Sequence, residues 1–138
     1  MKKIVIDTNV LLMSLPKISP YRPIFDALIQ GKYQLLITEG IFQEYKEIIG
    51  QKTTSQIAHN LGELFTQLEN VQLIRVFFNW NLIFIDPDDN KFVDCTITGN
   101  AKYLVTEDKH FKILKDIEFP KVNVINADEF LKEILEES

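Results

Sequence analysis

The sequence predicts an α/β fold, a three-layer α/β/α sandwich around a central, mostly parallel sheet of five strands. Two observations lead to this class. Short apolar segments rich in Ile and Val alternate with longer segments whose apolar residues recur at helical spacing. The first predicted strand, residues 2–7, contains the continuous apolar run Ile4-Val5-Ile6 and ends at an acid, as expected for a strand buried on both faces. The chain has no repeat or linker, so we expect a single domain over residues 1–138.

The other strands are expected at four further apolar segments. Gly31 and Gly40 bracket a strand at residues 33–38. A third apolar segment, residues 81–85, stops at Asp86-Pro87. The last two strands are expected over residues 103–106 and 122–125.

Helices are expected between these strands, over residues 23–30, 41–50, 57–68, 90–100 and 127–135. Pro23 is suited to a first helical turn, and Gly50 to a C-terminal cap. The third helix has the clearest amphipathic pattern, carried by Ile57, Leu61, Leu64, Phe65 and Leu68. The last helix has Asn126 or Asp128 as its N-cap.

Composition and charge limit the classes of protein. No apolar run is long enough to span a bilayer or to serve as a signal peptide, so we expect a cytoplasmic protein without a membrane partner. Cys95 is the only cysteine, which excludes an internal disulfide and suits a reducing compartment. The net charge of −5 argues against a simple nucleic-acid binder, because such proteins usually present a basic surface.

Three acids are placed near the ends of predicted strands. Asp7 follows the first strand, and Asp108 lies two residues beyond the fourth. Because ligands of open α/β sheets bind beyond the carboxyl ends of the strands, we expect both side chains at the same edge. Asp94 falls early in the fourth predicted helix and shares a face with Ile97, so it should turn toward the body of the protein.

A fourth acid, Glu44, sits roughly 100° from the centre of the apolar stripe of its helix, at 3.6 residues per turn, whereas Glu47 points away from the core. Glu44 is therefore placed to lean over the same edge of the sheet. Four converging carboxylates would repel one another and raise each other's pKa without compensation. Mg²⁺ or Mn²⁺, which prefer oxygen ligands, would offset this repulsion and could activate water for attack on a phosphate.

Each acid also has a structural alternative. Asp7 could cap the helix that follows, and Asp108 could cap a short turn. Asp94 could complement a helix dipole, and Glu44 could be a solvated flank residue. The functional hypothesis therefore depends on all four acids meeting at one edge of the sheet.

Together these residues resemble the PIN-domain family, and in particular bacterial PIN proteins assigned as toxin components of toxin–antitoxin pairs. The similarity is carried by the opening Val5-Ile6-Asp7-Thr8-Asn9, by Glu44, and by the stretches 86–94 and 101–108. It covers essentially the whole chain. The opening motif alone has low specificity, and the combined order and spacing give the resemblance its weight.

The resemblance implies a metal-dependent endoribonuclease that uses Mg²⁺ or Mn²⁺ on a five-stranded parallel sheet. The family's acidic positions carry over, as catalytic residues and metal ligands, to Asp7, Glu44, Asp94 and Asp108. Asn9 and Thr106 match positions that support the acids by hydrogen bonding. Because family members commonly form dimers and toxins are restrained by an antitoxin, the resemblance also implies a homodimer and an antitoxin partner.

The expected chemistry extends to the products and the substrate contacts. Attack by water on phosphorus would leave a 5′-phosphate and a 3′-hydroxyl. The acids at 86, 88 and 89 should form a turn that caps the next helix at Asn90, with Asp89 as a supporting residue. The basic residues expected to contact RNA are Lys17, Arg22, Lys91 and Lys109.

One alternative comes from another functional class: a PIN fold that binds RNA or protein without turnover. The presence of all four acids argues against this alternative, and the acidic net charge favours it. The positions of the four basic residues discriminate between the two hypotheses. If these residues surround the acids, the enzyme is favoured, and if they scatter, the binding module is favoured.

Overall fold

The five strands form one parallel sheet. The computed structural model describes residues 1–83 and 86–137. The sheet has the order β3-β2-β1-β4-β5, and every pairing in it is parallel. The strands are β1 (Lys3–Ile6), β2 (Gln34–Ile37), β3 (Val71–Leu73), β4 (Tyr103–Val105) and β5 (Val124–Ile125). The carboxyl ends of the strands therefore share one edge, and the predicted α/β class is confirmed.

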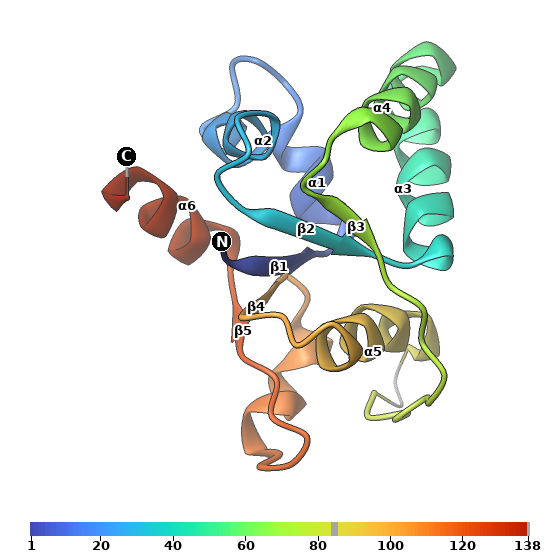
Figure 1. The fold of residues 1–138 in the computed structure, drawn as a ribbon, viewed down its shortest axis with the longest axis vertical. Helices are drawn as coiled ribbons and strands as arrows, with labels where there is room; N and C mark the ends of the chain where they lie inside the picture. The colour runs from blue at the N-terminus through green and yellow to red at the C-terminus, as the bar shows by residue number, and fades with distance from the viewer. Residues whose placement is uncertain (84–85, 138) are drawn as a thin grey trace.

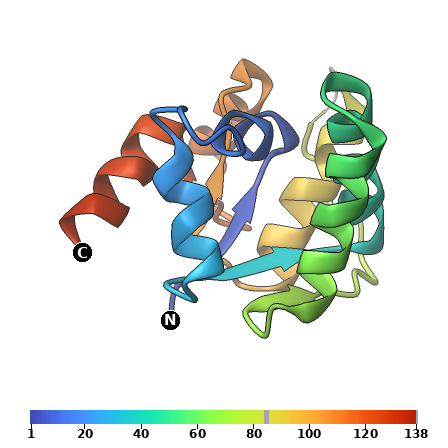
Figure 2. The same ribbon diagram turned by 90° about the horizontal axis from the view of Figure 1, so that it is seen from above.

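Helices cover both faces of this sheet and complete three layers. On one side lie α1 (Thr8–Ser14), α2 (Arg22–Ile29), α3 (Glu39–Lys52) and α4 (Ser55–Gln67) (Figure 1). The opposite side carries α5 (Asn90–Thr98) and the 3-10 helix η2 (Lys109–Asp116). A short 3-10 helix, η1 (Pro87–Asp89), precedes α5. The last helix, α6 (Ala127–Glu136), packs beside α2, and α3 and α4 form an adjacent pair (Figure 2).

The central strand β1 owes its position to its composition. Ile4, Val5 and Ile6 are each 0% exposed, because helices cover both of its faces and strands flank both of its edges. A continuous apolar run is what such a position requires. The strand ends at Asp7, which the packing of β1 fixes at the carboxyl edge of the sheet.

The helix boundaries follow the predicted caps with one exception. Asn126 caps α6 in a capping box with Glu129, as the sequence indicated. The prediction that Gly50 ends its helix was wrong, because α3 continues to Lys52. A Cβ at Gly50 would lie 3.5 Å from the Ala58 side chain, an ordinary packing distance, so the contact between α3 and α4 does not require glycine at this position. The short helix α1 was not predicted.

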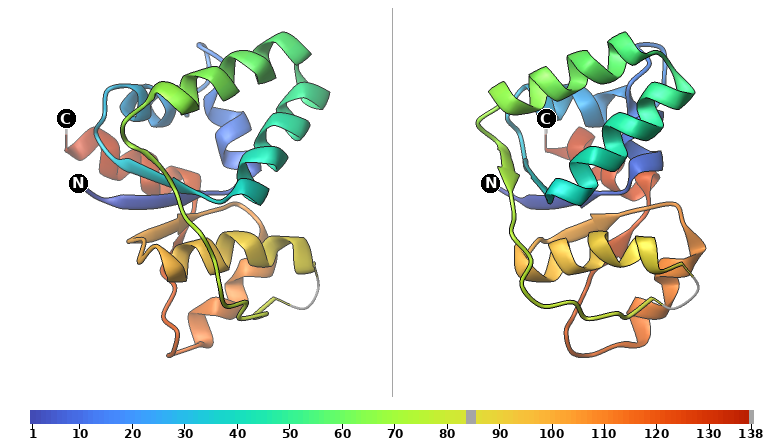
Figure 3. Two further views of the ribbon diagram at one scale, coloured as in Figure 1. Left: turned by 45° about the vertical axis from the view of Figure 1, so that its right-hand side comes forward. Right: turned by 90° about the vertical axis from the view of Figure 1, so that its right-hand side faces the viewer.

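The predicted third strand was also wrong. Residues 81–83 form no strand, residues 84 and 85 lie outside the described part of the chain, and β3 is Val71–Leu73. The backbone of Ile83 instead pairs with a side chain: its N–H donates to Asn90 Oδ1 and its carbonyl accepts from Asn90 Nδ2, both at 2.8 Å. The chain after β3, residues 74–83, leaves the sheet and passes beneath α5, on the side away from the strands (Figure 3).

No helix in the described ranges is both long and apolar enough to cross a membrane.

Candidate active site

Asp7 and Asp108 lie together at the carboxyl edge of the sheet, joined through one buried hydroxyl. Thr106 Oγ1 donates to Asp7 Oδ2 at 2.7 Å and accepts from the backbone N–H of Asp108 at 3.0 Å. Because β1 and β4 are neighbours in the sheet, the residues that follow them are brought side by side. Thr106 is 4% exposed, so this link is shielded from solvent.

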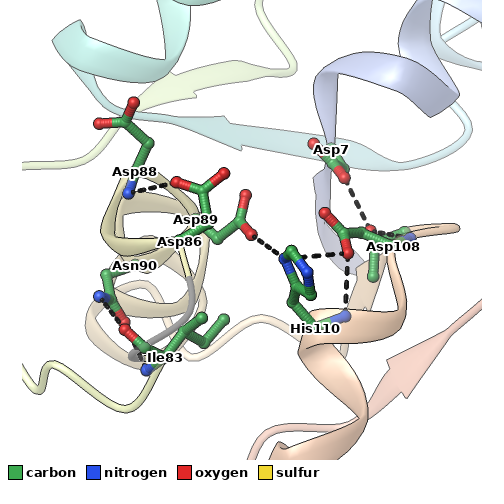
Figure 4. Close-up of polar contacts among 9 residues, drawn as sticks. Asp7, Ile83, Asp86, Asp88, Asp89, Asn90, Asp108 and His110 are labelled. Carbon is green, nitrogen blue, oxygen red and sulfur yellow. Dashed lines mark hydrogen bonds and ion pairs between the residues drawn. The ribbon is translucent and has the colours of Figure 1, made fainter.

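The capping alternatives for these two acids have different outcomes. Asp7 occupies the N-cap position of α1, but its side chain makes no capping hydrogen bond. Asp108 does cap the turn that follows, since its Oδ1 accepts from the backbone N–H of His110 at 2.9 Å. Capping by Oδ1 leaves the second oxygen of Asp108 available on the side that faces Asp7 (Figure 4).

Glu44 reaches the same edge from α3. One of its carboxylate oxygens accepts a hydrogen bond from the Thr8 hydroxyl, and the other is 2.7 Å from Lys91 Nζ. Thr8 directly follows Asp7, and Tyr45, next to Glu44, donates its hydroxyl to the Ile6 carbonyl. These contacts hold the start of α3 against the end of β1, so Glu44 is an anchored carboxylate rather than a solvated flank residue.

Asp89 is the fourth carboxylate at this edge. His110 Nδ1 lies 3.4 Å from Asp89 Oδ2 and 3.4 Å from Asp108 Oδ1, so the imidazole bridges the two acids (Figure 4). Ligand atoms of Asp86, Asp89 and His110 all lie within 4.8 Å of one another. Asp7, Glu44, Asp89 and Asp108 are referred to below as the acidic cluster, with Asp86 and His110 at its outer side.

The position of Asp94 is different from the one the sequence predicted. Its side chain is buried, but Oδ1 accepts from the backbone N–H of Trp80 at 3.1 Å, in the segment that passes beneath α5. It also lines a pocket with Arg75 and Phe77. The expected convergence of Asp94 with the other acids is therefore not observed among the described residues: the carboxylate turns toward the protein body, as predicted, but contacts this segment instead of the acidic cluster.

Some of the predicted supporting residues and cations lie at the acidic cluster, and others lie away from it. Thr106 contacts two acids, whereas Asn9 is exposed on α1 and, among the described residues, makes no hydrogen bond to the acidic cluster. Lys91 pairs with Glu44, and Lys109 follows Asp108. Two predicted RNA contacts lie elsewhere, in a groove of about 780 Å³ between the α1–α2 loop and α4; these are Lys17 and Arg22.

The electrostatics of the acidic cluster favour a bound cation. Burial, followed by the charges of Glu44 and Asp108, raises the pKa of Asp7 above its ordinary value, although the Thr106 hydroxyl opposes this effect. Burial also raises the pKa of Asp89 to about 6, and the charge of Asp108 adds to it. Carboxylate oxygens that repel one another in a partly buried site match the ligand preference of Mg²⁺ and Mn²⁺, so the donor set fits such an ion.

Two residues at this site were not predicted as functional. Asp86 was assigned to a turn, and no role was assigned to His110. Asp86 does cap η1, by accepting from the backbone N–H of Asp88 at 3.2 Å. The only sequence signal for His110 was its spacing, two residues after Asp108, which places a side chain next to the acid that caps the same turn.

Replacing Asp89 by Asn should stabilise the metal-free protein. At pH 7.5 the carboxylate is ionised in the folded and unfolded states, but its charge is penalised only in the fold, where the pKa is about 6 against an ordinary 3.8. After allowance for solvent screening we expect the free energy of unfolding to rise by about 1 kcal/mol. The melting temperature, measured by scanning calorimetry, should rise by ~4 °C.

The pH dependence provides the control for this prediction. As the pH falls below about 6, folded Asp89 takes up a proton that the unfolded chain does not bind, so the penalty disappears. The difference in melting temperature between variant and wild type should therefore shrink from pH 7.5 to pH 5. A difference that grows as the pH falls would show that Asp89 is stabilised as a carboxylate.

The fold and this edge define a class: an α/β protein with a parallel sheet and a group of carboxylates beyond its strand ends. A family model described as PIN domain matches residues 3–110, a range that includes the whole acidic cluster and His110. The chain belongs to the PIN-domain family.

Solved structures support the same fold. A chain of the VapBC2 complex from Rickettsia felis, bound to a DNA fragment from its promoter, is similar with a TM-score of 0.62 and 17% identity, covering 90% of this chain and 98% of that one. A chain of DNA-bound VapBC from Salmonella typhimurium is similar with a TM-score of 0.57 and 11% identity, and the match covers 92% of this chain and 99% of that one. Curated protein sequences give no match to the chain.

Proposed function

We propose that this PIN domain is a metal-dependent endoribonuclease and the toxin component of a toxin–antitoxin pair. The observation that carries the proposal is the acidic cluster, in which four carboxylates, from α3, from η1 and from the segments that follow β1 and β4, gather at the carboxyl edge of the sheet. Buried acids with raised pKa values are destabilising without a bound cation, and such groups cluster at functional sites. Membership of the PIN-domain family supports phosphodiester hydrolysis as the function.

Each residue of the site has a proposed role. Asp7, Asp89 and Asp108 hold Mg²⁺ or Mn²⁺, and His110 keeps two of these carboxylates apart and oriented. A divalent cation bound there would lower the pKa of a coordinated water and offset charge on the phosphate. Glu44, fixed by Thr8 and Lys91, orients the attacking water or contributes a further ligand.

Positively charged groups next to the acids receive the substrate backbone. Lys91 lies beside Glu44, so its ammonium group can be shared between that carboxylate and an incoming phosphate. Lys109 follows Asp108 and lines a small pocket together with Thr106 and Asp108. Lys17 and Arg22 line the separate groove and are not proposed as contacts of the scissile phosphate.

The proposed function predicts a specific pair of product ends. Incubation of the protein with single-stranded RNA and Mn²⁺ should give fragments with 5′-phosphates and 3′-hydroxyls, because water attacks phosphorus. Cleavage should stop on addition of EDTA and return with excess Mn²⁺. Fragments ending in 2′,3′-cyclic phosphates would contradict this mechanism, since they require attack by the ribose 2′-hydroxyl and no metal-activated water.

A binding module without turnover is the second candidate. Two observations favour it: the net charge of −5, and the separation of Lys17 and Arg22 from the acids. Saturable RNA binding without cleavage, under conditions that load Mn²⁺, would support this candidate over the nuclease.

An antitoxin partner and a homodimer form part of the proposal. The support for the antitoxin is the fold match to chains of two VapBC complexes, each bound to DNA. The homodimer rests on the family resemblance.

A further inference from the structure

Large aromatic side chains gather on the surface near the segment that passes beneath α5. Phe77 is 91% exposed and Phe78 is 62% exposed, and Phe119, from the loop after η2, is 83% exposed. Single exposed apolar residues are common, but several exposed rings in one place usually mark a binding surface. Neither the core nor the acidic cluster accounts for them.

Three of the aromatic rings support one another. The Phe78 and Trp80 ring centroids are 4.8 Å apart at an interplanar angle of 70°, and those of Trp80 and Phe119 are 6.1 Å apart at 83°. The backbone N–H of Trp80 is held by Asp94, and the neighbouring Asp94 side chain is buried. The rings of Phe78 and Phe119 are therefore largely exposed but rest on Trp80, which belongs to an anchored segment.

A pocket of about 490 Å³ lies between this segment, α3 and α5. It is lined by the start of α3, by the segment after β3 through Arg75, Phe77 and Asn79, and by α5 through Lys91 and Asp94. Because α3 and this segment follow β2 and β3, the pocket lies at the same carboxyl edge of the sheet as the acids. Lys91 lines the pocket and pairs with Glu44, so the two sites share a residue.

We propose that Phe77, Phe78, Trp80 and Phe119 form a stacking site for unpaired nucleobases on the β3 side of the acidic cluster. This proposal rests on the proposed ribonuclease function and adds a second binding site to it. A single-stranded nucleic acid needs open aromatic faces for its bases and cations for its phosphates. Here Phe77 lines the pocket together with Arg75 and Lys91, so the phosphates of a strand whose bases stack on the rings would meet these two cations, whereas an apolar protein segment would use neither.

Trp80 provides an intrinsic probe of this site, because it is the only tryptophan in the chain. In low-salt buffer with EDTA, where no cleavage occurs, a single-stranded oligouridylate should quench its fluorescence and reach saturation. An abasic oligomer of the same length should bind about 10-fold more weakly, since stacking of one base contributes roughly this factor or more. Equal binding of the two oligomers would overturn the proposal.

Variants separate stacking from plain hydrophobic contact. Phe77→Leu and Phe119→Leu remove a ring but keep an apolar side chain, and each should raise the dissociation constant about 10-fold. Phe77→Tyr keeps the ring and should bind as wild type does. Ile18→Ala is the matched control, at a side chain that is 96% exposed in the α1–α2 loop. Wild-type affinity in both Leu variants would overturn the proposal.

A substrate without bases distinguishes failure of this inference from failure of the proposed function. Cleavage of the abasic oligomer with Mn²⁺ at saturating concentration needs the acidic cluster but offers no base to stack. Its rate should be unchanged in both Leu variants, while their KM for RNA rises about 10-fold. If wild type binds RNA through the rings but hydrolyses neither substrate, the stacking site stands and the nuclease function fails. Equal losses on both substrates would overturn the stacking site.

Discussion

Asp89→Asn should abolish RNA cleavage, whereas Asp94→Asn should leave most of it. Asp89 lies beside Asp108 and His110 in the acidic cluster, so its loss removes a proposed metal ligand. We expect kcat to fall on the order of 100-fold or more, since even residues that only orient metal ligands contribute about 10- to 100-fold. Asp94 instead accepts a hydrogen bond from the backbone N–H of Trp80, and the amide oxygen of an Asn could still accept it. Its replacement should change kcat by less than about 5-fold.

Metal binding and folding provide the controls for this pair of variants. Mn²⁺ should raise the melting temperature of Asp94→Asn as it does for wild type, but should have a smaller effect on Asp89→Asn. Circular dichroism would establish that both variants fold. The reverse pattern, with an active Asp89→Asn and an inactive Asp94→Asn, would place the reaction in the pocket lined by Asp94 and would contradict the proposed site.

The different position of Asp94 follows from the course of the chain after α4. Helical periodicity correctly indicated a buried face for this residue but could not say which segment it would meet. A strand at residues 81–85, as the sequence predicted, would have put the preceding residues in a loop away from α5. Because the strand is Val71–Leu73, residues 74–83 run beneath α5, and the Asp94 carboxylate satisfies a backbone N–H of that segment.

The misassigned strand has a physical cause. In β3, Gln72 and Leu73 are exposed, because an edge strand needs only one neighbour and little apolar surface. Residues 82–85 are more hydrophobic and therefore gave the stronger strand signal. Ile83 is buried, but the Asn90 side chain pairs with both of its backbone groups, which a neighbouring strand would otherwise do. Local hydrophobicity cannot reveal a partner that is a side chain.

The parts of the site on β1 and β4 were easier to predict than the part on α5. An acid directly after a continuous apolar strand must lie at the sheet edge, so the positions of Asp7 and Asp108 follow from the strands alone. Asp89 sits in a short 3-10 turn whose direction depends on the packing of α5. The sequence assigned Asp89 to the turn and to a supporting role, and the catalytic role of the acidic cluster stays a prediction.

Thr106→Val should reduce both activity and stability, because one hydroxyl serves two acids. Valine has nearly the same shape, so the change removes the donor to Asp7 and the acceptor for the Asp108 backbone N–H with little change in packing. Asp7 would lose the bond that orients it, and a partly buried N–H would lose its partner. We expect kcat to fall about 10- to 100-fold and the free energy of unfolding to fall by about 1–2 kcal/mol.

Thr106→Ser separates these contributions, since serine keeps the hydroxyl but loses a buried methyl group. Serine should restore kcat with Mn²⁺ to within about 3-fold of wild type while still costing about 1 kcal/mol of stability, measured by urea denaturation. The affinity for Mn²⁺ should fall in the valine variant and recover in the serine variant, because only an oriented Asp7 can contribute fully to the metal site. If valine and serine lose activity equally, the methyl group rather than the hydroxyl is what matters, and the link between β1 and β4 has no role in positioning the acids.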